Sequence, residues 1–140
     1  MLRQAPSLVR RARLLPLISV IDDDASVRTA IENLLKSRGY IVHPFASAEE
    51  FLRSPELSKT SCVITDVQMP VMNGLELLAE MRARGYYAPC ILITAFPDDP
   101  VRTLASTAGA IGFLAKPFAG RALIKCLNKA LAEHRGGAGA

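Results

Sequence analysis

The chain has 140 residues and half of them are hydrophobic, which suits a single domain with an ordinary core and argues against disorder. Its net charge of +4 lies in residues 1–16, because removing Arg3, Arg10, Arg11 and Arg13 from the 17 basic residues leaves 13, equal to the 13 acidic ones. We therefore do not expect the folded part to bind nucleic acid directly.

No apolar run approaches the length of a membrane span, and Pro6 and Pro16 interrupt the apolar start, so neither a transmembrane helix nor a signal peptide is expected. The three cysteines, Cys62, Cys90 and Cys126, have neither metal-ligand nor CxxC spacing. We expect them to be small buried hydrophobic residues in a reducing compartment. These features predict a cytoplasmic protein without a membrane partner.

Residues 1–16 precede the first strand and carry the excess basic charge. A flexible arm is the favoured interpretation, although Ser7 to Leu15 could form a short amphipathic helix for a membrane surface or a partner. Runs of apolar residues then predict strands at residues 17–21, 40–45, 61–66, 89–95 and 110–115.

Helical periodicity follows each predicted strand. The first helix is expected to be capped by Asp24 and to stop at Gly39. The second opens with the capping-box pattern of Ser47 and Glu50, and the third ends near Gly85. Together these segments predict an α/β fold with a doubly wound five-stranded parallel sheet, because parallel strands need helical crossovers. We place the domain at residues 17–135, with a flexible tail at residues 136–140.

Polar side chains stand at the ends of four predicted strands. Asp22 and Asp23 follow the first strand, Asp66 ends the third, Thr94 ends the fourth and Lys116 follows the fifth. Parallel strands bring these ends to the same edge of the sheet, where open α/β sheets bind ligands. Two carboxylates about 4 Å apart repel by about 4 kcal/mol at an effective dielectric of about 20, so the cluster calls for a cation. Oxygen ligands without His or Cys favour Mg²⁺.

The same groups suit a phosphoryl group on Asp66. A carboxylate can act as a nucleophile and form an acyl phosphate. Mg²⁺ and the Lys116 ammonium can neutralise charge on the transferred oxygens, and the Thr94 hydroxyl can hydrogen-bond one of them. Strand-end Asp, Thr and Lys residues are often plain caps or solvated groups, but agreement at four strand ends favours the functional interpretation.

Four segments, VIDDD, VITDVQMPVMNG, ILITA and FLAKPF, resemble the signatures of response-regulator receiver domains from bacterial two-component systems. The resemblance is to CheY-like, FixJ-type receivers and covers about residues 17–133. It implies the flavodoxin-like (βα)5 fold with strand order 2-1-3-4-5. It also implies phosphorelay signal transduction, with a sensor histidine kinase as donor and a downstream effector protein or output domain as target.

The resemblance also assigns roles residue by residue. Asp66 would be the phosphoacceptor, Mg²⁺ would be held by Asp22, Asp23, Asp66 and the backbone carbonyl of Gln68, and a cis peptide is expected before Pro117. The remaining positions concern the phosphoryl group and the switch: Thr94, Ala95 and Lys116 beside the phosphoryl group, and Phe113 as the aromatic switch residue.

The implied switch is a population shift. On phosphorylation Thr94 would move toward the phosphoryl oxygens and the Phe113 ring would turn into the vacated space, changing the face formed by the fourth helix, the fifth strand and the fifth helix. Phe113 has no hydroxyl to fix the inward rotamer, so packing alone is expected to couple the site to this face. We expect weak, phosphorylation-dependent homodimerisation at most.

Three other functions remain open at this level. A haloacid-dehalogenase-like phosphatase uses similar groups, but its acid two residues after the nucleophile is replaced by Gln68, so we expect a slowly hydrolysed phosphoprotein rather than an enzyme. A flavodoxin-like electron carrier would need a phosphate loop where Asp22 to Asp24 stand. In a nucleic-acid-binding module that uses the arginine arm, the affinity for nucleic acid would fall steeply with salt concentration and would be lost on deletion of residues 1–16.

Overall fold

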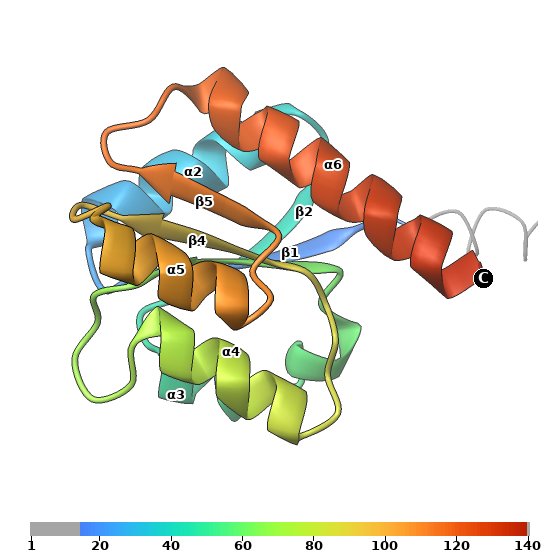
Figure 1. The fold of residues 1–140 in the computed structure, drawn as a ribbon. Helices are drawn as coiled ribbons and strands as arrows, with labels where there is room; N and C mark the ends of the chain where they lie inside the picture. The colour runs from blue at the N-terminus through green and yellow to red at the C-terminus, as the bar shows by residue number, and fades with distance from the viewer. Residues whose placement is uncertain (1–14, 140) are drawn as a thin grey trace, which may run out of the picture.

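The computed structural model describes residues 15–139, with side chains described to residue 133, so the arm predicted at the start lies almost entirely outside the described residues. Its sheet has five parallel strands in the order β2-β1-β3-β4-β5, as the resemblance implies (Figure 1). The strands are β1 (Leu17–Ile21), β2 (Ile41–Phe45), β3 (Cys62–Asp66), β4 (Cys90–Thr94) and β5 (Gly112–Ala115).

A helix follows every strand, which confirms the predicted alternation. The helices are α2 (Ala25–Ser37), α3 (Ala48–Leu52), α4 (Gly74–Ala83), α5 (Asp99–Thr107) and α6 (Gly120–Gly139), with a 3-10 turn at Leu57–Lys59 that the sequence did not indicate. Within the described part of the chain, no helix combines the length and the apolar character needed to cross a bilayer.

Side-chain caps explain why several helices begin where they do. Asp24 accepts hydrogen bonds from Ser26 N and Val27 N, which confirms it as the cap of α2. Ser47 accepts from Glu50 N at the start of α3. A complete capping box also opens α4, where the side chains of Asn73 and Glu76 each accept a backbone N–H of the other residue.

Helices cover both faces of the sheet, so the central strands are buried on both sides. Helices α2 and α6 lie on one face, and α3, α4 and α5 lie on the other (Figure 1). Successive residues of β3 face opposite layers: Cys62 and Ile64 pack in the α2-α6 layer, and Val63 packs against α3 and α4. Because both faces of the third and fourth strands are buried, successive residues in these strands are apolar.

The register of the sheet brings the polar strand ends together. Ile21 pairs with Thr65, Asp66 pairs with Ile93, and Thr94 pairs with Ala115. The residues that follow β1 and β5 therefore lie at the same edge as the ends of β3 and β4. The last helix differs from expectation: α6 continues to Gly139, through the glycine-rich stretch for which composition predicted a flexible tail.

The loop after Asp66 depends on a close backbone approach at Gly74. The Gly74 N–H donates to the Val67 carbonyl at 2.9 Å, and a Cβ at position 74 would lie 2.4 Å from the carbonyl oxygen of Asp66. No side chain fits there without moving the backbone of the residue that ends β3. Gly74 therefore helps to fix the position of Asp66.

We predict that Gly74→Ala lowers the free energy of unfolding by about 2 kcal/mol or more, because a fixed backbone oxygen would have to move. Gly39→Ala is the control: Gly39 has φ +89° and open space around it, so its cost is limited to about 1 kcal/mol of backbone strain. Urea unfolding of the two variants measures the difference. Equal losses of stability would show that the close approach at Gly74 is unimportant.

Candidate functional site

Three carboxylates meet at the carboxyl edge of the sheet. One oxygen each from Asp22, Asp23 and Asp66 lies within 4.8 Å of the others. Asp22 and Asp66 are only 1% and 6% exposed, whereas Asp23 is exposed to solvent. The prediction that these three acids cluster is confirmed. Such a group is unfavourable in the absence of a positive charge, because the buried members lose hydration and repel one another.

Lys116, which follows β5, supplies a positive charge to the cluster. Its Nζ donates to Asp22 Oδ2 at 3.1 Å and lies 3.5 Å from Asp66 Oδ1. Burial alone would lower the pKa of Lys116, but the hydrogen bond and charge of Asp22, helped by Asp66, raise it above its usual value. The ammonium is therefore charged at neutral pH and ties β5 to β1 and β3.

One lysine does not compensate three acids. Burial and the charge of Asp22 raise the pKa of Asp66 to about 6, although the Lys116 charge opposes this rise. Asp66 Oδ1 is buried and has no hydrogen-bond partner. An orphaned carboxylate oxygen among three acids fits a divalent cation with oxygen ligands, so the residues present suit Mg²⁺.

Two backbone contacts hold Asp22 in place. Asp24 N donates to Asp22 Oδ1 at 2.9 Å, which leaves Oδ2 for Lys116. The Arg28 guanidinium, one turn into α2, donates to the Asp22 carbonyl oxygen at 2.6 Å. Sequence analysis missed Arg28, because a basic residue on a helix gives no signal of the carbonyl it will reach.

Thr94 ends β4 and is fully buried, and its hydroxyl already has two partners. It accepts a hydrogen bond from Phe96 N at 2.9 Å and donates to Gln68 Oε1 at 2.7 Å. The Gln68 side chain was not among the predicted groups; only its backbone carbonyl was, as a metal ligand, and that role stays a prediction. No sequence signal pairs Gln68 with Thr94, which are 26 positions apart.

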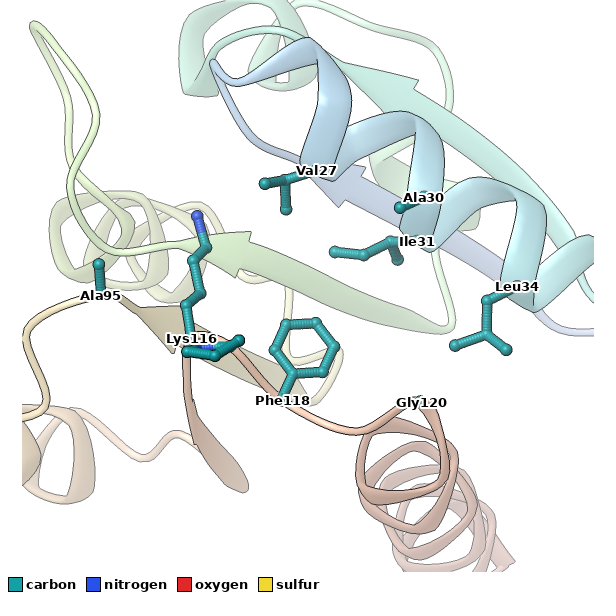
Figure 2. Close-up of a pocket in the computed structure, with 9 residues that line it drawn as sticks. Val27, Ala30, Ile31, Leu34, Ala95, Lys116, Phe118 and Gly120 are labelled. Atoms are coloured by element: carbon teal, nitrogen blue, oxygen red, sulfur yellow. The ribbon is translucent and has the colours of Figure 1, made fainter.

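An apolar groove of about 680 Å³ lies beside the charged cluster. Figure 2 shows Val27, Ile31 and Leu34 of α2 on one wall and the Phe118 ring on the other, with the Lys116 side chain rising at one end. Ala95 lines the groove close to Lys116, and the Lys116-Pro117 peptide is cis, as the resemblance implied. The groove therefore joins an apolar surface to the polar site.

Phe113, the expected switch residue, is partly buried in β5 and packs against the α5 layer. The Arg102 guanidinium of α5 lies over its ring, 4.7 Å from the ring centre, which is a cation-π contact. The expectation that packing alone acts on this ring did not include Arg102. Both residues also line a smaller hollow between α5 and β5.

We predict that Asp66→Asn stabilises the metal-free protein at pH 7.5 by on the order of 2 kcal/mol. The pKa of Asp66 is raised to about 6 in the folded protein, from 3.8 for an ordinary aspartate. The protonated Asp66 therefore contributes fully to the free energy of unfolding below about pH 4, and this contribution is lost as pH rises through about 6, where the carboxyl group of the folded protein ionises. The gain on substitution should be large at pH 7.5 and nearly absent at pH 4.

Urea unfolding in EDTA at both pH values measures this. Asp24→Asn is the matched control, because it removes a neighbouring exposed charge and asparagine caps a helix as well as aspartate. An Asp66→Asn protein no more stable than wild type at pH 7.5 would contradict the electrostatic description of the site.

Comparison with known proteins identifies the family and the fold. The family model of the response regulator receiver domain matches residues 18–128. The transcriptional regulatory protein FixJ of Azorhizobium caulinodans is 40% identical over 114 residues, which are 81% of this chain and 54% of FixJ. The response regulator protein TodT of Pseudomonas putida is 37% identical over 114 residues, 81% of this chain and 50% of TodT.

Among solved structures, the chemotaxis protein CheY4 of Vibrio cholerae superposes with a TM-score of 0.78 and 29% identity, over 84% of this chain and 99% of CheY4. The chain spans about half the length of the curated relatives named above. The matched residues include the whole acid cluster and all five strands except Leu17, and the chain belongs to the response-regulator receiver domains of two-component systems.

Proposed function

We propose that this receiver accepts a phosphoryl group on Asp66 from a sensor histidine kinase, in the presence of Mg²⁺, and changes a surface that controls an effector or output domain. The observation that carries the proposal is the buried Asp66 carboxylate, whose Oδ1 has no hydrogen-bond partner although Lys116 lies 3.5 Å away. The free buried cysteines, Cys62 and Cys90, agree with a reducing, cytoplasmic setting.

Asp22, Asp23, Asp66 and the backbone carbonyl of Gln68 would hold the cation. When bound, Mg²⁺ supplies positive charge that offsets the acids and the transferred phosphoryl oxygens. Lys116, whose Nζ lies 3.1 Å from Asp22 and 3.5 Å from Asp66, would contribute a second positive charge. Asp22 is kept in position by Arg28 and by the cap of α2, so the site is largely formed before any ligand arrives.

Asp66 would act as the nucleophile. One of its carboxylate oxygens forms a bond to phosphorus while the bond between phosphorus and the histidine nitrogen of the kinase breaks, and that nitrogen leaves with the electron pair. The product is an acyl phosphate on Asp66. Position 68 carries glutamine, which cannot serve as a general acid or base for hydrolysis, so the phosphoryl group would leave slowly.

The output face would consist of α5, β5 and α6. Thr94 would turn its hydroxyl to the phosphoryl group, and the Phe113 ring would enter the space left behind. This movement would break the contact between Phe113 and Arg102, so Arg102 would favour the unphosphorylated state. Exposed Leu104 on α5 is the sort of residue that a partner, or weakly a second copy of the chain, would cover.

The groove between α2 and the loop after β5 is the surface on which we place the phosphoryl donor. A donor histidine must reach Asp66, so its protein has to cover the surface next to Lys116, and the apolar surface there is this groove. The name of FixJ as a transcriptional regulatory protein supports a transcriptional output domain as one target. A separate effector protein is the other target in this proposal.

Incubation with acetyl phosphate and Mg²⁺, followed by intact-mass measurement, tests the function. We expect one phosphoryl adduct on the wild type, none on Asp66→Asn, and none in EDTA. Asp24→Asn, which leaves the α2 cap intact, is the control and should label as wild type. Release of inorganic phosphate without a surviving adduct would favour the phosphatase instead, and no reaction at all would overturn both.

Ala30→Glu tests the groove, because it places a charged side chain among the lining residues on an exposed helical position where glutamate suits the helix. The measured quantity is phosphotransfer from autophosphorylated histidine kinases divided by labelling with acetyl phosphate. We expect this ratio to fall by about tenfold or more. Thr29→Glu, on the adjacent exposed position outside the groove, is the control. An unchanged ratio for Ala30→Glu would place the donor elsewhere.

A further inference from the structure

The Thr94 hydroxyl can donate only one hydrogen bond, and that bond is already made. The Phe96 N–H can only donate, so at 2.9 Å it uses a lone pair of Thr94 Oγ1. The single hydroxyl proton therefore points to Gln68 Oε1, 2.7 Å away. A phosphoryl oxygen on Asp66 is also purely an acceptor, so it would compete with Gln68 for the same proton.

We infer that the Gln68 side chain is a latch that holds Thr94 in the unphosphorylated arrangement and sets the position of the switching equilibrium. The inference rests on the proposed function, because it takes Thr94 to be the group that binds the phosphoryl oxygens. Gln68 is a positioning residue in this role: it acts through Thr94 and does not need to touch the phosphoryl group.

The backbone around Gln68 is fixed while its side chain is free to leave. Val67 N donates to the Ile93 carbonyl at 2.8 Å, which ties the loop to β4 just before Thr94. Val67 and Met69 are buried on either side, whereas Gln68 is exposed. The carboxamide can therefore exchange the Thr94 hydroxyl for water without moving the loop, so the latch opens at small cost.

Substituting Gln68 by methionine keeps the length and flexibility of the side chain and removes the acceptor. The probe is beryllium fluoride with Mg²⁺, a stable mimic of the phosphoryl group, titrated while the Thr94 methyl signal is followed by NMR. A neutral hydrogen bond at a partly exposed site predicts that Gln68→Met binds the probe about two-fold to tenfold more tightly. The Thr94 methyl signal of the free variant should also shift toward its position in the bound wild type.

Two controls separate the latch from a general effect on the loop. Val71→Met introduces the same residue at a side chain that is 91% exposed in the same loop, and it should bind as wild type. In a Thr94→Val background no hydroxyl proton exists, so Gln68→Met should change affinity no further. An equal gain in both backgrounds would mean that Gln68 acts on the ligand directly, and it would overturn the latch.

The outcomes also distinguish the latch from the proposed function. A wild type that forms no acetyl-phosphate adduct and binds no beryllium fluoride would overturn both. If the wild type forms the adduct and binds beryllium fluoride, and Gln68→Met has the same affinity and the same Thr94 methyl signal as the wild type, the latch alone is overturned.

Discussion

The crowding of Asp22, Asp23 and Asp66 around a single ammonium group is the constraint on which the rest of the structure depends. The carboxylates lie within 4.8 Å of one another, two of them are buried, and burial with the Asp22 charge raises the pKa of Asp66 to about 6. The fold maintains this arrangement through the parallel register, the cap of α2 and the close approach at Gly74. A site whose acids repel one another gains stability from a cation that compensates their charge.

Local and periodic signals predicted most of the fold. The buried strands β3 and β4 were visible as apolar runs, Asp24 as a helix cap, and the meeting of strand ends followed from parallel topology. The boundaries differed by one or two residues where backbone pairing begins later than the apolar run, as at β5, which starts at Gly112 rather than at residue 110. Helix α6 extends to Gly139, farther than composition suggested, because glycine content lowers helix propensity without fixing the point where a helix ends.

The site was predicted at the level of residues but not of contacts. Strand-end positions placed the acids, Thr94 and Lys116 correctly, since backbone register alone decides which strand ends meet. The bonds of Gln68 to Thr94, Arg28 to Asp22 and Arg102 to the Phe113 ring depend on side-chain directions across separate elements. Each of these contacts involves a residue to which the proposed function gives a role in binding or in the switch. The sequence therefore identifies the functional residues, and the structure shows the contacts that hold them in place.

The charge state of Asp66 links the physical constraint to the function, and carbon-13 NMR of its carboxyl group measures it most directly. Asp66 would be followed from pH 3 to 9 with and without Mg²⁺, using Asp66→Asn to assign the signal. We expect a midpoint of about 6 without metal and a clearly lower one with saturating Mg²⁺, because the cation favours the ionised carboxylate. The account would be contradicted if the titration midpoint of Asp66 lay near 3.8, the pKa of an ordinary aspartate, and did not change when Mg²⁺ was added.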